Sequence, residues 1–315
     1  MSVVKSVKLN DGIEVPVIAF GIGTALAKID TFSYVESALK HGYRHFDCAW
    51  HYRNGEYTGK AMRESGIPRE EIFISAKIGD FEGDPSEFNA NQFTETLLKD
   101  LGVDYVDLLM LHADILVGSV TEAWKQMETL KERGLARSIG VSNFSTESLE
   151  KILKICKITP SVNQIEFHPY SLPTYLPTLI PLCKEHGIKI AAYGSLMSIT
   201  RHQGGPVDQV VKLISEERGF GQSEGQILLK WAQQINGGIV ITTTTKESRM
   251  AEQIKPFLDT PSYTDLSQEH IRDISDAGAS APFRNWGTNW PYFMKGEGGI
   301  EACAPNATHL NKADI

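Results

Sequence analysis

The chain has 315 residues, of which 41% are hydrophobic and 22% are charged, and its formal net charge at pH 7 is -8. This length suits one large α/β domain, and a closed α/β barrel can use it as a single unit. Acidic residues outnumber basic ones by 39 to 31, so the composition gives no electrostatic footprint for nucleic acid or an anionic membrane. With no secretion signal and no apolar run long enough to span a bilayer, we expect a cytoplasmic location.

The cysteines and histidines show no pattern of a disulfide framework or a metal site. None of the four cysteines has a paired spacing, so we expect reduced thiols. The histidines lack metal-ligand spacing, so we expect no metal. The cysteines are Cys48, Cys156, Cys183 and Cys303.

The N-terminal residues predict a small β-hairpin over residues 6–16. Polar and apolar residues alternate from Ser6, and the turn signal Asn10-Asp11-Gly12 leads into a returning strand. A buried strand at 17–21 then runs into the loop Gly21-Ile22-Gly23-Thr24. Its two glycines allow the backbone to approach a ligand closely, and a tight strand-to-helix turn explains them equally well.

From residue 17 onwards, short apolar strands alternate with helical patterns. The strands are predicted at 17–21, 44–48, 72–77, 106–112, 136–141, 161–165, 188–193 and 238–241. The helices are predicted at 30–41, 56–65, 89–101, 120–133, 146–156, 173–186, 223–234 and 246–253. Eight such units with no break in composition predict a single (β/α)8 TIM barrel domain over residues 1–315, with an extra C-terminal helix or loop. The alternative is an open doubly wound sheet, which is disfavoured because no G-x-G-x-x-G opens a helix after a strand.

Titratable side chains gather where the predicted strands end. Asp47, Lys77 and His112 each lie at a strand end, and Tyr52 follows Asp47 by five residues. In a barrel these ends meet at one rim, so a carboxylate, a phenol, an ammonium and an imidazole would share a proton-transfer site. Lys77 with Asp47 alone fits a structural ion pair equally well, and Tyr52 and His112 shift the balance.

The residue types suggest how this group would react. A free tyrosine has a pKa of about 10. An adjacent ammonium favours the phenolate, so we expect Lys77 to lower the pKa of Tyr52 and to make it a better acid near neutral pH. His112 can orient a substrate oxygen, and the assembly suits protonation of a carbonyl oxygen while another group attacks the carbon.

Taken together, the motifs resemble those of the aldo-keto reductase family along almost the whole chain. Fungal members that reduce α-keto amides and conjugated polyketones share the threonine-rich stretch at 241–246 and a short C-terminal segment. The matching stretches are Phe46-Asp47-Cys48-Ala49 with Tyr52, Asn54 and Glu56, Lys77 at a strand end, Asp104-Tyr105-Val106-Asp107-Leu108 with His112, Gly140-Val141-Ser142-Asn143-Phe144, Val162-Asn163-Gln164-Ile165-Glu166 with His168-Pro169, and Tyr193.

This resemblance implies an NADPH molecule extended across the barrel rim without a Rossmann fold. Ser142, Asn143 and Gln164 would hold the nicotinamide carboxamide, and Tyr193 would stack on the ring. Arg249 would contact the 2′-phosphate at a helix N-terminus, where backbone N–H groups favour an anion. The implied cofactor residues are Gly23, Thr24, Asp47, Ser142, Asn143, Gln164, Tyr193, Ser195, Leu196, Ser198, Thr242, Thr243, Thr244, Thr245, Lys246, Arg249 and Gln253.

Two departures from the family pattern affect specificity. Thr243 stands where many relatives carry a lysine at the 2′-phosphate, so NADH is a possible second cofactor. Ala25 and Ala113 replace large aromatic residues of relatives and would open the substrate pocket. The candidate pocket residues are Ala25, Trp50, His51, Ala113, Trp286 and Trp290, of which the last two could equally anchor the C-terminal segment at 280–315.

The sequence therefore predicts an NADPH-dependent carbonyl reductase with Tyr52 as the general acid. Lys77 and Asp47 would tune this acid. Its partner would be a small activated carbonyl such as a 1,2-dicarbonyl, an α-keto amide or a keto lactone, and we expect a monomer. One alternative is a cofactor-binding regulatory subunit with little catalysis, and another is a barrel lyase or isomerase without nicotinamide.

Overall fold

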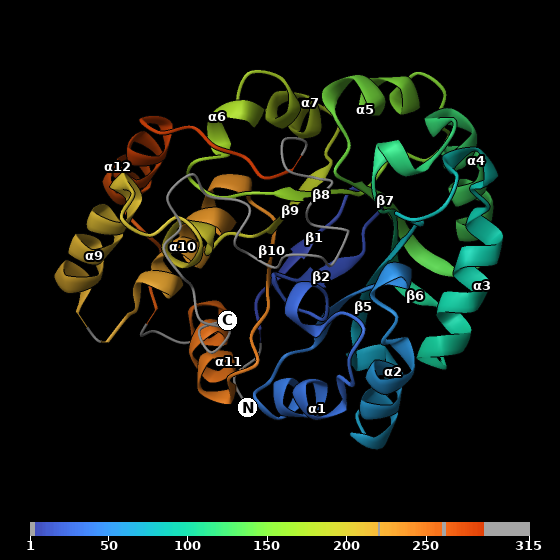
Figure 1. Cartoon of the computed structure of the whole chain (residues 1–315), viewed down its shortest axis with the longest axis horizontal. Coiled ribbons are helices and arrows are strands. Elements are labelled where there is room, and N and C mark those ends of the chain that lie inside the picture. Colours follow the sequence, from blue (N-terminus) through green and yellow to red (C-terminus); the bar gives the residue numbers. More distant parts are fainter. Residues whose placement is uncertain (1–3, 220, 260–262, 287–315) are drawn as a thin grey trace.

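The structure, a computed structural model, describes residues 4–219, 221–259 and 263–286. Its centre is a closed barrel of parallel strands ringed by helices (Figure 1). Around the barrel the order is β10-β3-β4-β5-β6-β7-β8-β9, so each strand pairs with its neighbour in sequence and the last strand pairs with the first. The strands are β3 (Ile18–Gly21), β4 (His45–Ala49), β5 (Phe73–Ile78), β6 (Val106–Leu111), β7 (Ala136–Ser142), β8 (Val162–Glu166), β9 (Lys189–Tyr193) and β10 (Ile239–Thr242). The predicted (β/α)8 barrel is confirmed.

Helices follow the strands and cover their outer faces. They are α1 (Phe32–Lys40), α2 (Gly55–Glu64), α3 (Ala90–Leu101), α4 (Val120–Glu132), α5 (Thr146–Leu153), α6 (Leu172–Tyr175), α7 (Leu179–Glu185), α8 (Met197–Thr200), α9 (Pro206–Arg218), α10 (Glu224–Asn236), α11 (Glu247–Ile254) and α12 (Gln268–Ala279). In the described part of the chain, every helix is too short or too polar to cross a membrane.

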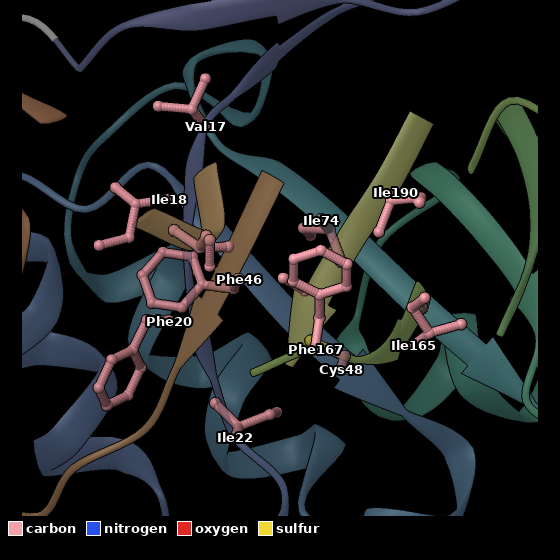
Figure 2. Close-up of a cluster of buried hydrophobic side chains, with 14 of the residues drawn as sticks. Val17, Ile18, Phe20, Ile22, Phe46, Cys48, Ile74, Ile165, Phe167 and Ile190 are labelled. Carbon is pink, nitrogen blue, oxygen red and sulfur yellow. The ribbon is translucent and has the colours of Figure 1, made fainter. Parts of the chain in front are cut away.

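Alternate residues of each strand face opposite sides of the barrel wall. One set, which includes Phe20, Phe46 and Ile74, packs with helix residues in the large hydrophobic cluster of Figure 2. The other set fills the barrel interior, where Phe73 and Met110 belong to a second, smaller cluster. Because the period is two, a polar residue between two outward apolar ones must face the interior.

The predicted N-terminal hairpin is also confirmed. Its strands are β1 (Ser6–Lys8) and β2 (Glu14–Pro16), and they pair in antiparallel register. Leu9 and Val15 belong to the interior cluster of the barrel, so the hairpin closes the end at which the strands begin. In Figure 1 it lies across the middle of the barrel.

The helical predictions differ from the structure in two places. The single helix predicted at 173–186 is wrong, because α6 ends at Tyr175 and α7 begins only at Leu179. Pro177 lies in this gap and has no N–H to donate to a helical hydrogen bond, and the backbone leaves the helical conformation at Thr178, with φ of -135°. No helix was predicted at α9, which begins with a proline after two glycines, and the extra C-terminal helix or loop, predicted without bounds, includes the helix α12. These two helices lie side by side at the outer edge of Figure 1.

Candidate functional site

The carboxyl ends of β4 and β5 place a buried ion pair at the barrel rim. The Nζ of Lys77 lies 2.5 Å from Oδ2 of Asp47, and the two residues are 1% and 3% exposed. The strand register pairs Asp47 with Ser75 and Ala49 with Lys77, so the ion pair is diagonal rather than level. Burying two charges is costly unless further hydrogen bonds support them.

Asp47 has that support on its other oxygen. Its Oδ1 accepts hydrogen bonds from the Ser75 hydroxyl at 3.0 Å and from the Gln164 side-chain amide at 2.9 Å. Oδ2 is thereby left for Lys77. The four side chains come from β4, β5 and β8, so the closed barrel is what brings them together.

Tyr52 lies directly after β4, in the 3-10 turn Trp50–Tyr52. The Lys77 Nζ lies 5.3 Å from the centroid of its ring, and the centroid of the His112 ring lies 5.8 Å from it. Gly23 lies against the same ring, where a Cβ would come within 2.8 Å of the phenol oxygen. Glycine at 23 therefore lets this loop approach the tyrosine. The predicted set of Asp47, Tyr52, Lys77 and His112 lies together at one rim.

The balance of charges differs from the expectation for Tyr52. Burial raises the pKa of Tyr52 above its usual value, and the opposing effect of the Lys77 ammonium is smaller. The prediction of a net lowering is therefore wrong, because desolvation disfavours the phenolate more than the ammonium favours it. Burial alone would lower the pKa of Lys77, but Asp47 and Tyr52 outweigh it and raise that pKa. At neutral pH the pair is a phenol beside an ammonium.

His112 follows β6 at the same rim. Its backbone N–H donates to the Ile78 carbonyl at 2.9 Å, and Phe81 packs on its ring at 4.7 Å between centroids. Burial, and secondly the Lys77 ammonium, hold the pKa of His112 well below its usual value, so the imidazole is neutral. Its buried Nδ1 has no hydrogen-bond partner among the described residues.

A polar cluster at the ends of β7, β8 and β9 faces the same rim. The Asn143 amide donates to the His112 carbonyl at 3.1 Å and accepts from the Tyr193 hydroxyl at 2.8 Å. The Ser142 hydroxyl donates to the Gln164 carbonyl at 3.0 Å. Asn143 adopts a left-handed backbone with φ of 55°. Ser142, Asn143, Gln164 and Tyr193, the four residues implied for the nicotinamide, thus form one hydrogen-bonded group.

The loop after β9 carries further predicted residues. Ser195 and Ser198 are 1% and 0% exposed, and their hydroxyls have no partner among the described residues. Leu196 precedes the short helix α8. Buried hydroxyls without partners are rare in proteins, so these two point to a polar ligand. Thr24 lies in the loop after β3, two strands from β9 around the barrel, and has a left-handed φ of 52°.

The threonine run at the end of β10 makes hydrogen bonds within the protein. Thr242 donates to the Gln253 side chain at 3.0 Å, and Thr243 donates to the Gly21 carbonyl at 2.9 Å. Thr244 accepts from the backbone N–H of Lys246 at 3.1 Å. These three hydroxyls therefore support the loop itself.

The N-terminus of α11 follows the threonine run and is rich in charged residues. Lys246 is the N-cap of this helix, and Glu247 and Arg249 lie in its first turn. Thr245 is half-buried in the bend before it.

The predicted substrate-side residues have mixed surroundings. Trp50 packs edge-on against Phe93 at 4.7 Å, with the Arg53 guanidinium 3.4 Å from its ring centroid. The His51 ring packs against Phe81. Ala25 is exposed and Ala113 is buried. Trp286 is described, and Trp290 and Cys303 lie outside the described residues.

Glu166 is a buried group to which the sequence analysis gave no role of its own. It lies at the end of β8, is 1% exposed and accepts from His168 Nε2 at 2.7 Å. Its two oxygens also accept the backbone N–H groups of Asn285 at 2.9 Å and Trp286 at 2.7 Å. Burial favours the acid form, but the His168 and backbone hydrogen bonds outweigh it and lower the pKa of Glu166. The alternation of β8 places Glu166 on the inward face with Gln164, and this position could have identified it as a buried polar group.

Comparison with known proteins gives consistent matches. An indole-3-acetaldehyde reductase of Schizosaccharomyces pombe, described as NAD/NADP-dependent, is 41% identical over 255 residues, 76% of this chain and 86% of that protein. An NADPH-dependent α-keto amide reductase of Saccharomyces cerevisiae is 36% identical over 290 residues, 86% of this chain and 89% of that protein. The crystal structure of an aldo/keto reductase from Brucella melitensis aligns with a TM-score of 0.75 at 33% identity, over 88% of this chain and 99% of that one.

The match extends through the barrel. The sequence model of the aldo/keto reductase family covers residues 18–275, from the first barrel strand to α12. The structural match spans the same barrel, and the rim of that barrel carries the four titratable residues. The chain belongs to the aldo/keto reductase family of oxidoreductases.

Proposed function

We propose that this protein reduces the carbonyl group of a small molecule with a nicotinamide cofactor, and that Tyr52 donates the proton. The observation that supports this is the buried ion pair of Lys77 and Asp47 beside the Tyr52 ring. Proton donation by a positioned side chain typically contributes roughly 10² to 10⁴ in rate. A bound nicotinamide would supply the hydride.

The residues divide the work by their protonation states. Tyr52 stays a phenol because burial raises its pKa, so it holds the proton that a carbonyl oxygen needs. Lys77 stays an ammonium because Asp47 raises its pKa, and its charge favours the phenolate left after donation. His112 stays neutral, so it can donate one N–H to the same carbonyl oxygen without competing as an acid.

The rim fits a nicotinamide dinucleotide in three respects. Gln164 and Asn143 present side-chain amides suited to a carboxamide, and Tyr193 lies beside Asn143 as a stacking surface. The unpartnered hydroxyls of Ser195 and Ser198 suit a pyrophosphate.

Cofactor choice follows from the α11 end of the site. The Thr243 hydroxyl donates its proton to the Gly21 carbonyl. The 2′-phosphate of NADPH would therefore depend on backbone N–H groups, Lys246 and Arg249. We therefore propose that NADPH is used and that NADH is accepted as well. The description of the S. pombe relative as NAD/NADP-dependent supports this.

The proposed substrate is an activated carbonyl such as a 1,2-dicarbonyl, an α-keto amide or a keto lactone. The small side chain of Ala113, which follows His112 in the chain, supports a roomy substrate site beside the carbonyl-orienting imidazole. The S. cerevisiae relative, described as an α-keto amide reductase, supports this class.

The test is loss of absorbance at 340 nm with NADPH and separately with NADH, against isatin, ketopantoyl lactone, an α-keto ester and a simple aldehyde. We expect fast oxidation with the dicarbonyls. Tyr52→Phe should lower kcat by at least about 10²-fold, because the general acid is lost, while cofactor affinity stays within about twofold. A fully active Tyr52→Phe would refute the assignment of the acid. Tight cofactor binding with no turnover of any carbonyl would instead favour a regulatory subunit.

A further inference from the structure

Polar residues continue into the barrel beneath the ion pair. His45 and Asp47 take the inward positions of β4, and Ser75 and Lys77 take those of β5, because Phe46 belongs to the outer cluster. His45 and Ser75 are each 1% exposed. Two polar side chains in this interior need a reason, because an apolar pair would fill the same space without desolvation cost.

These residues form a continuous chain of contacts. His45 Nδ1 lies 3.0 Å from the Pro16 carbonyl of the N-terminal hairpin, and its Nε2 lies 3.0 Å from the Ser75 Oγ. The Ser75 hydroxyl donates to Asp47 Oδ1 at 3.0 Å. The chain thus reaches from the closed end of the barrel to the carboxylate that binds Lys77.

The number of protons decides where the serine hydroxyl points. A carbonyl only accepts, so His45 carries its proton on Nδ1 and donates to Pro16. Burial lowers the pKa of His45 to about 4, so at neutral pH its Nε2 carries no proton. The single hydroxyl proton of Ser75 then has Nε2 and Asp47 Oδ1 as acceptors, both at 3.0 Å. The carboxylate is the charged acceptor and forms the stronger bond.

We propose that Ser75 is a positioning residue, whose hydroxyl bond to Oδ1 fixes Asp47 with Oδ2 toward Lys77 and so keeps the ammonium beside the Tyr52 ring. This inference rests on the proposed function. Ser75 suits the task because its Cα is the direct register partner of Asp47 and its short side chain has one rotatable bond before the oxygen. Gln164, the other donor to Oδ1, reaches across from β8 on a longer side chain.

The test compares Ser75→Ala, Ser75→Cys and Ser75→Thr with a matched control. Ser138 is also a buried barrel serine that donates to a carboxylate, Asp11 Oδ2 at 2.8 Å, at the opposite end. We expect Ser75→Ala to lower kcat about tenfold, the size expected for one hydrogen bond to a charged group, with cofactor affinity changed by less than about twofold. Ser75→Cys should show a similar loss, because a thiol is a weak donor. Ser75→Thr should restore activity, and Ser138→Ala should keep it.

A second readout needs neither substrate nor cofactor. In ¹⁵N-lysine-labelled protein, the Lys77 ammonium protons should exchange slowly in the wild type, because Asp47 holds them in a buried contact. We expect that signal to broaden in Ser75→Ala and Ser75→Cys and to remain in Ser138→Ala. A Lys77→Met variant would assign the signal.

The outcomes separate this inference from the proposed function. A fully active Tyr52→Phe would overturn the function. An inactive Tyr52→Phe together with a fully active Ser75→Ala, or a Lys77 signal unchanged in Ser75→Ala, would overturn only the positioning role. Equal losses in Ser75→Ala and Ser138→Ala would also overturn it, because the effect would then be a general one of the barrel interior.

Discussion

The two ends of the barrel differ in how their buried polar groups are paired. At the end where the strands begin, Asp107 accepts from Arg69, from Arg137 and from the Ile74 backbone, so its charge is fully paired, although Arg69 Nε has no partner among the described residues. At the rim, His112 Nδ1 and two serine hydroxyls have no partner among the described residues.

Backbone strain follows the same division. Thr24, Arg53 and Asn143 adopt left-handed backbone conformations at the rim, where each lies beside a proposed site residue. Such conformations cost free energy in residues other than glycine. One end therefore surrounds a buried carboxylate with donors, and the other carries the strained backbone beside the proposed site.

The largest expected effect is a loss of stability on substitution of Asp107, at the end where the strands begin. Asp107→Ala leaves Arg69 without its buried carboxylate and the Ile74 N–H without its acceptor. We expect the free energy of unfolding to fall by about 3 to 5 kcal/mol, as for loss of one member of a buried pair. Urea unfolding measures this. The folded fraction should retain wild-type kcat, and a kcat loss as large as that of Tyr52→Phe would erase the distinction between the two ends.

The second effect is a pH dependence of the unfolding free energy, caused by His45 in the barrel interior. Burial lowers the pKa of His45 from its ordinary value of 6.5 to about 4. Between pH 6.5 and about pH 4, His45 is therefore protonated in the unfolded chain and neutral in the folded chain. Stability from this group is complete above pH 6.5 and is lost as the pH falls toward 4. The loss should reach about 3 kcal/mol across that window.

The control for this pH effect is His45→Asn, which keeps a donor for the Pro16 carbonyl and does not titrate. Urea midpoints of both proteins at several pH values between neutral and acidic give the comparison. We expect the variant to lose less stability than the wild type over the same range. Parallel curves would show that His45 contributes nothing to the pH dependence.

The smallest effect sharpens the comparison at the rim itself. Thr243→Val removes the hydroxyl that donates to Gly21 and leaves that carbonyl without this donor. We expect a loss of about 1 kcal/mol in unfolding free energy and an NADPH affinity within about twofold of wild type. A large drop in NADPH affinity, with NADH affinity unchanged, would mean that the hydroxyl binds the 2′-phosphate instead. Fluorescence titration with both cofactors measures this.

The barrel and the four rim residues could be predicted from the sequence because they follow from the hydrophobic periodicity and from the positions of residues at strand ends. Strand alternation and the rule that parallel strands end together place Asp47 and Lys77 correctly. The helix at 173–186 failed because local periodicity continued through Pro177 while the backbone did not.

The remaining differences at the site needed three-dimensional information. The sign of the Tyr52 shift depends on how deeply the phenol is buried, and no sequence pattern states that depth. The partner of Thr243 lies in β3, 222 residues away in the chain, and the partner of Thr242 lies in α11, 11 residues further on. Ser75 was visible as an inward residue by parity, but its contact with His45 required the strand register.

Glu166 attaches residues 285 and 286 to the barrel through their backbone, whatever their side chains are. Its carboxylate binds the main-chain N–H groups of Asn285 and Trp286, which any residue except proline can offer. Side chains at these two positions can therefore change without loss of this attachment to the barrel. A substitution at Trp286 can therefore change the surface that this position presents at the rim while the main-chain bond to Glu166 and the barrel beneath it stay the same.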